Sequence, residues 1–158
     1  MRIFSEYHDC FVLSVLCAAR PTQTDSWETD RLALDIYDYL DLRTIRSSLG
    51  LRRPADSYRF GYFDLPSPVF RDTGFTIDTE DWHYGIDVLA IADFDADGRT
   101  EVLARFVDIA KTASYFDASP VILRRTKAGG LIEGERLVWS VLNGAFTNWP
   151  DDPMTCAP

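Results

Sequence analysis

The chain has 158 residues, a net charge of −9 at neutral pH, and a hydrophobic content of 46%. This length fits one domain with a real core, and so large a hydrophobic fraction argues against disorder. The negative charge argues against nucleic acid and anionic membrane surfaces as partners, because their phosphates would repel it. We therefore expect the chain to bind either another protein with a basic surface or a cation.

The first 20 residues admit two interpretations. Residues 11–19 form a short apolar run that ends in small residues, as in a secretory signal, and an exported protein would be periplasmic or secreted. Glu6 and Asp9, however, lie where a signal carries basic residues. The alternative is an amphipathic helix from about Ser5 to Ala19 in a cytoplasmic protein. In either case the run is too short for a transmembrane helix.

The three cysteines, Cys10, Cys17 and Cys156, form no CxxC pair, and the chain has only two histidines. This composition argues against a structural zinc site. One disulfide between an N-terminal cysteine and Cys156 is compatible with the sequence. The odd count leaves at least one thiol unpaired within the monomer.

Residues 21–158 predict a single α+β domain, made mainly of antiparallel strands with one or two short helices. Alternating apolar side chains favour a strand over about Arg31–Tyr39. Leu32, Ile36 and Leu40 also share one helical face, so a helix remains the alternative. Further along, we expect short strands at Tyr58–Phe63 and Phe75–Ile77, with Leu65–Asp72 as a loop or an edge strand.

The longest alternation begins at Trp82, with the even-numbered side chains to Ala92 on one face. Glu101–Val107 predicts the second strand of a central hairpin. The remaining expectations are a polar surface loop at Asp108–Ala118, a strand at Pro120–Thr126, a turn at Lys127–Gly130, a strand or short helix within Leu131–Leu142, and an irregular tail from Asn143.

One basic segment stands out on this acidic chain. It contains Arg43, Arg46, Arg52, Arg53 and Arg59. Two interpretations stay open. The arginines either pair with the chain's own acids or form a site for an anion or carboxylate, which the guanidinium group binds in a bidentate manner.

The central hairpin carries the sharpest chemical signal, a run of acids between the two strands. Hard cations prefer oxygen ligands, and carboxylates at every second position followed by a glycine let a chain wrap around such an ion. The candidate Ca²⁺ ligands are the carboxylates of Asp93, Asp95, Asp97 and Glu101 and the backbone carbonyl of Arg99, with Gly98 at the sharp turn.

This loop departs from the EF-hand, because Ala104 occupies the twelfth position, where an EF-hand has a bidentate glutamate, and because its flanks alternate like strands. Residues 92–103, with the pattern D-x-D-x-D-G-x-x-E, instead resemble the calcium loop of FG-GAP/VCBS-type repeats. The resemblance implies the loop and its metal. Those families stack many repeats into a propeller, whereas this chain has one loop. A short chain with a single such loop also resembles small bacterial envelope proteins.

Four carboxylates in one turn repel one another unless a cation neutralises them. Calcium is the ion we expect, since magnesium prefers fewer protein ligands and more waters. The alternatives are another divalent ion or a metal-free acidic turn whose charge Arg99 and Arg105 partly offset.

Three function hypotheses follow. The first is a non-catalytic, calcium-stabilised interaction protein, and the second is an immunity or inhibitor protein that neutralises a basic toxin or enzyme. The third is a small hydrolase that uses the acidic loop. The sequence contains no G-x-S-x-G, P-loop, G-x-G-x-x-G or H-E-x-x-H motif, so no catalytic residue is assigned. A pair between His83 and Asp81 or Asp87 is conceivable, but a structural histidine is the simpler interpretation.

Overall fold

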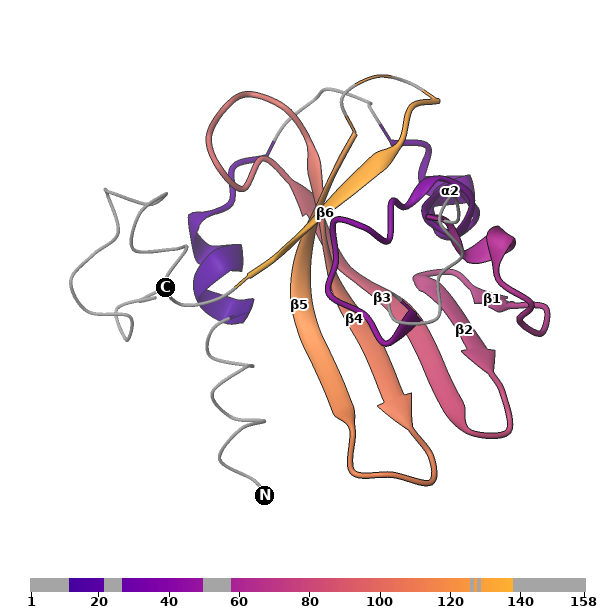
Figure 1. Ribbon diagram of the computed structural model, residues 1–158. Helices are drawn as coiled ribbons and strands as arrows, with labels where there is room; N and C mark the ends of the chain where they lie inside the picture. The colour runs from indigo at the N-terminus through magenta and orange to yellow at the C-terminus, as the bar shows by residue number, and fades with distance from the viewer. Residues whose placement is uncertain (1–11, 22–26, 50–57, 126, 128, 138–158) are drawn as a thin grey trace.

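Within the residues that the computed structural model describes (12–21, 27–49, 58–125, 127 and 129–137), six strands form one antiparallel sheet in sequential order (Figure 1). The strands are β1 (Val69–Arg71), β2 (Gly74–Asp78), β3 (Trp82–Ala92), β4 (Glu101–Ala110), β5 (Phe116–Arg125) and β6 (Ile132–Arg136). Each strand pairs with the one before it, as expected for consecutive strands joined by short turns. The chain is thus a single domain, mainly β with some helix, consistent with the predicted α+β class.

One face of the sheet carries the larger core. The helix α2 (Leu32–Tyr39) and the segment that follows it cover this face, and two short 3₁₀ turns, η1 (Thr29–Arg31) and η2 (Phe60–Tyr62), flank them. Strand side chains such as Ile86, Phe106 and Leu123 meet these elements and are fully buried or nearly so.

The opposite face carries a second, smaller cluster. Residues 12–18 are helical, and Val15 of this helix packs with Phe94, Leu103 and Ile122. Figure 1 shows this helix and α2 on opposite sides of the sheet. Residues 12–18 of the segment for which the sequence allows a signal or a first helix are thus helical, while residues 1–11 lie outside the described part. The choice between the two interpretations stays open. Cys17 of this helix is disulfide-bonded.

A β-bulge interrupts the alternation of β3. The pairing with β4 shifts between Val88 and Ala90, so Ile91 packs toward the larger core and Ala90 toward the smaller one. The predicted single face from Trp82 to Ala92 is wrong beyond Val88, because the extra residue inverts which side chains face each side.

The strand predicted at Arg31–Tyr39 is wrong, and the helix alternative is the observed structure. Leu32, Ala33, Ile36 and Leu40 are buried at helical spacing against the sheet.

Two further expectations fail. Tyr58–Phe63 contains the 3₁₀ turn η2 and no strand. The predicted surface loop at Asp108–Ala118 is instead the end of β4 and the start of β5, joined by a turn at 111–115. Asp108 is fully buried there, and it accepts hydrogen bonds from Ser48 N and Ser48 Oγ at 2.6 and 2.7 Å. Its polarity is satisfied by partners far away in the sequence.

Other expectations are confirmed. The central hairpin is β3–β4, Phe75–Ile77 lies within β2, and Leu65–Asp72 contains the short edge strand β1. Leu131–Leu142 begins with the strand β6, and the predicted tail from Asn143 lies outside the described residues. Among the described residues, no helix has the length and apolar character needed to cross a bilayer.

Candidate metal centre

The loop between β3 and β4 turns sharply over residues 93–100 (Figure 1). Two residues have left-handed backbone conformations, Ala96 with φ 63° and Gly98 with φ 84°. Glycine adopts such angles without steric cost, which explains why this residue type suits the turn. The tight winding brings the side chains of Asp93, Asp95 and Asp97, at every second position, and that of Glu101 together.

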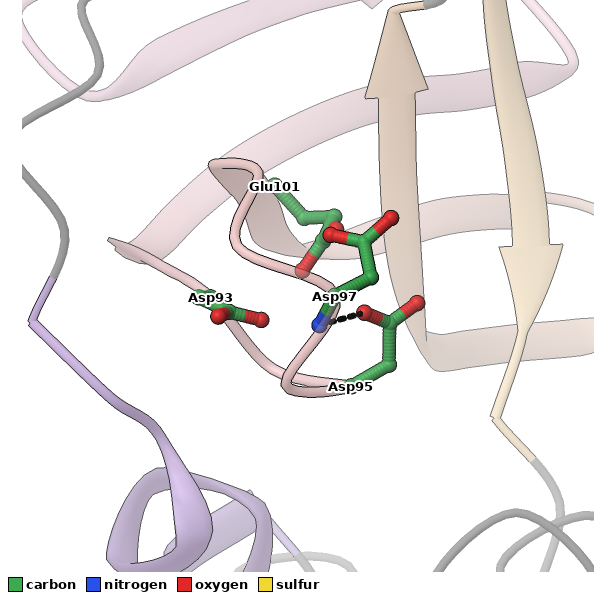
Figure 2. A group of neighbouring side chains, drawn as sticks. All are labelled: Asp93, Asp95, Asp97 and Glu101. Atoms are coloured by element: carbon green, nitrogen blue, oxygen red, sulfur yellow. Dashed lines mark hydrogen bonds between the residues drawn. The ribbon is translucent and has the colours of Figure 1, made fainter.

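Four carboxylates converge inside this turn, those of Asp93, Asp95, Asp97 and Glu101 (Figure 2). One oxygen from each lies within 4.8 Å of the others, so the group could hold a metal ion. Asp93 and Glu101 are buried, with 5% and 2% of their surface exposed, whereas Asp95 and Asp97 are open to solvent. The site therefore has a buried inner side and an accessible outer side.

Backbone amides of the loop hold the outer carboxylates in place. Asp95 Oδ1 accepts a hydrogen bond from Asp97 N at 3.1 Å, and Asp97 Oδ1 accepts one from Arg99 N at 2.8 Å. Each bond occupies one oxygen of its carboxylate. Asp95 Oδ2 also accepts a hydrogen bond from Arg124 Nη2 at 3.3 Å, whereas Asp97 Oδ2 accepts none among the described residues and can serve a ligand.

The inner carboxylates are held in the same manner. Asp93 Oδ2 accepts a hydrogen bond from Gly98 N at 3.0 Å, and Glu101 Oε2 accepts one from Phe94 N at 2.8 Å. These two bonds close the loop across its base. They fix the two buried carboxylates before any ion arrives, which reduces the cost of organising the site.

Among the described residues, one oxygen of the two buried carboxylates has no hydrogen-bond partner. Asp93 Oδ1 is buried and accepts no hydrogen bond in the structure. A buried polar atom without a partner costs about 1–3 kcal/mol, and more when it is charged. Native proteins rarely leave such an atom unsatisfied, so Asp93 Oδ1 is an oxygen suited to a cation.

Among the described residues, basic side chains form ion pairs with the outer acids. Arg124 Nη2 lies 3.3 Å from Asp95 Oδ2, and Arg99 Nε lies 4.0 Å from Asp97 Oδ2. Among the described residues, neither Asp93 nor Glu101 forms an ion pair. The negative charge is thus least compensated where it is most deeply buried.

Burial raises the pKa of Glu101 above its ordinary value. The hydrogen bond from Phe94 N and the charge of Arg124 oppose this shift without cancelling it, whereas the neighbouring charges of Asp95 and Asp97 add to it. The carboxylate form is therefore disfavoured without a counter-charge, and a bound cation would supply that charge.

The loop is also where the N-terminal segment attaches to the sheet. Arg20 and Asp93 exchange backbone hydrogen bonds of 2.9 and 3.0 Å, and Trp27 Nε1 donates to Thr100 O at 2.9 Å. The side chain of Phe94 is buried beside the 12–18 helix. A change in the loop would therefore reach the helix and the segment that leads to α2.

The sequence analysis identified all four carboxylates that the structure brings together. The role predicted for the Arg99 carbonyl stays a prediction. The sequence analysis did not identify Arg20, Trp27 and Arg124 as neighbours of the loop, because they come from distant parts of the chain and carry no local motif.

The suggested pairing of His83 with Asp81 or Asp87 is wrong. His83 Nδ1 lies 3.1 Å from Asp78 Oδ1, and Lys111 Nζ lies 2.7 Å from the same oxygen. The hydrogen bond from Lys111, and next that from His83, lower the pKa of Asp78. This exposed cluster joins two turns at the end of the sheet away from the acidic loop.

The chain matches no protein-family model, no curated protein and no solved structure. The resemblance to FG-GAP/VCBS loops therefore rests on the loop residues alone. The geometry of the carboxylates supports a metal site without it.

Proposed function

We propose that the β3–β4 loop binds Ca²⁺ and that this chain is a non-catalytic, calcium-stabilised interaction protein. The observation that carries the proposal is the buried, unpartnered Asp93 Oδ1 among four converging carboxylates. Calcium accepts six to eight oxygen ligands in flexible geometry, and the four carboxylates and the Arg99 carbonyl would supply most of them. Solvent at Asp95 and Asp97 would complete the shell.

The proposed role of the ion is to hold the fold together. It would neutralise Asp93 and Glu101 at the base of the hairpin, and it would fix the loop to which Arg20 and Trp27 attach. Because only the folded chain assembles the site, binding would raise the stability of the folded state by mass action. A partner with a basic surface suits the net charge of −9 and is consistent with an inhibitor or immunity role.

Thermal unfolding tests this proposal. We expect EDTA to lower the melting temperature of the purified protein and an excess of Ca²⁺ to restore it, with Mg²⁺ less effective. The Asp93→Asn variant should lose the response to Ca²⁺. The matched control is Asp72→Asn, which changes an exposed acid outside the loop and should keep the full response. Identical melting temperatures of the wild-type protein in EDTA and in Ca²⁺ would refute a stabilising calcium site.

A further inference from the structure

Three arginines and three aromatic rings alternate in one stack beside α2. We call this group the arginine–aromatic stack. Its members in order are Arg43, Tyr58, Arg59, Tyr39, Arg125 and Trp27.

The distances between neighbours are those of cation–π contacts. Arg59 Cζ lies 5.2 Å from the Tyr58 ring centroid and 5.6 Å from that of Tyr39. Tyr62 adds a third ring around the same guanidinium group, at 5.9 Å. Tyr62 also meets Tyr58 edge-on, with ring centroids 5.4 Å apart. Three tyrosine rings therefore surround Arg59 and fix the plane of its side chain.

The two other arginines of the stack have carboxylate partners. Arg43 Nη2 lies 2.5 Å from Asp41 Oδ2, and Arg125 Nη2 lies 3.0 Å from Asp35 Oδ2. The Arg125–Asp35 pair is largely buried, with side chains 6% and 14% exposed. These ion pairs give Arg43 and Arg125 a structural role in the fold.

Arg59 differs from both. Within the described part of the chain its guanidinium group forms no ion pair and no hydrogen bond, and its Nε, like that of Arg125, is buried without a partner. The Arg59 residue as a whole is half-buried, and its two Nη atoms are not among the buried side-chain atoms that lack a partner. An arginine that is oriented by aromatic rings, and whose donors are unused, is the kind of group that binds an oxyanion.

We propose that Arg59 binds the carboxylate group of an aromatic ligand, with Tyr58 and Tyr62 as the walls of the site. The planar guanidinium matches the two oxygens of a carboxylate, and one positive charge neutralises its single negative charge. A phosphate would bring up to two negative charges to a protein of net charge −9, and one arginine would not offset them. Tyr62, which is 51% exposed, leaves an apolar ring surface open to the body of the ligand. This inference is independent of the calcium proposal.

NMR titration of the protein with sodium benzoate, in a buffer without added Ca²⁺, tests the site. We expect saturable shifts of the Arg59 Nε–Hε signal and of the Tyr58 and Tyr62 rings, with a dissociation constant on the order of 1 mM for so small a ligand. Benzamide has the same ring without the charge and should give no saturable shift. Sodium chloride at equal concentration measures the effect of ionic strength, and inorganic phosphate should bind more weakly than benzoate.

Two variants of Arg59 distinguish the contribution of its positive charge from that of its planar guanidinium group. Arg59→Met should abolish benzoate binding, and Arg59→Lys, which keeps the charge but lacks the planar fork, should weaken it about tenfold. Arg31→Met removes an exposed arginine outside the stack and should bind as the wild type does. The proposal is overturned if Arg59→Lys binds benzoate as tightly as the wild type, if benzamide binds equally well, or if phosphate binds more tightly than benzoate.

Discussion

The indole Nε1 of Trp27 donates a hydrogen bond to the carbonyl oxygen of Thr100, 2.9 Å away and 73 positions along the chain. Thr100 directly precedes Glu101, so the bond ties the start of the α2 region to the base of the acidic loop. The guanidinium of Arg125 lies over the same indole at 4.7 Å. Trp27 thus contacts both the candidate metal centre and the arginine–aromatic stack.

This position makes Trp27 a natural reporter of ion binding. We expect Ca²⁺ to change the tryptophan emission of the chelator-treated protein, because an ordered loop alters the surroundings of the indole. The Trp27→Phe variant should lose this change and should lose roughly 0.5–1.5 kcal/mol of unfolding free energy along with the hydrogen bond. Fluorescence titration and urea unfolding measure the two effects. Trp82→Phe, at the end of β3 away from the loop, is the control. A full calcium response in Trp27→Phe would contradict the proposed link.

Gly74 allows two strands to approach closely. A Cβ built on Gly74 would lie 1.8 Å from the carbonyl oxygen of Ile86, so no side chain fits without moving the β2–β3 pairing. Gly74→Ala should therefore cost about 2 kcal/mol of unfolding free energy or more. Gly61→Ala is the matched control, because a Cβ there meets nothing within 4 Å. Urea unfolding compares the two variants, and equal stability of both would show that the close approach is wrong.

The Asp78 cluster predicts a pH dependence whose sign can be stated. Because the hydrogen bonds from Lys111 and His83 lower the pKa of Asp78 in the folded state, the folded chain holds this proton less tightly than the unfolded chain. The cluster therefore adds stability above the unfolded pKa, and this contribution disappears as the pH falls through the folded pKa. Lys111→Met removes the larger cause and should raise the pKa of Asp78 toward its ordinary value. NMR titration of the Asp78 carboxyl measures this, and His83→Gln should give a smaller rise. An unchanged pKa in Lys111→Met would contradict the assignment.

The sequence predicts the central hairpin because strand alternation is a local pattern, which β3 follows as far as Val88 before the bulge. The eight residues of α2 are too short for alternation and helical spacing to be told apart, and packing against the sheet decides between them. The polar character of Asp108–Ala118 suggested a loop because polar side chains usually lie on the surface. The partners that satisfy Asp108 come from Ser47 and Ser48, about 60 positions away, and no local pattern reveals them.

The candidate metal centre is likewise predictable from the sequence only in part. Its four carboxylates fall within nine consecutive residues, so their spacing alone predicts that they meet. Arg20, Trp27 and Arg124 reach the loop only through the fold. The surroundings of Arg59 likewise depend on the fold. Tyr39, Tyr58 and Tyr62 surround its guanidinium group, and Tyr58 and Tyr62 are near it in sequence, whereas Tyr39 is not. Among the described residues its guanidinium group forms no ion pair.

Isothermal titration calorimetry with Ca²⁺ tests the central claim most directly. The chelator-treated wild-type protein should bind one Ca²⁺ per chain, with a dissociation constant of about 1 mM or lower for a site of this ligand set. Asp93→Asn and Glu101→Gln should each weaken binding strongly, and Asp72→Asn should leave it unchanged. The account is contradicted if the wild-type protein shows no saturable binding of Ca²⁺, or if Asp93→Asn binds the ion as tightly as the wild type does.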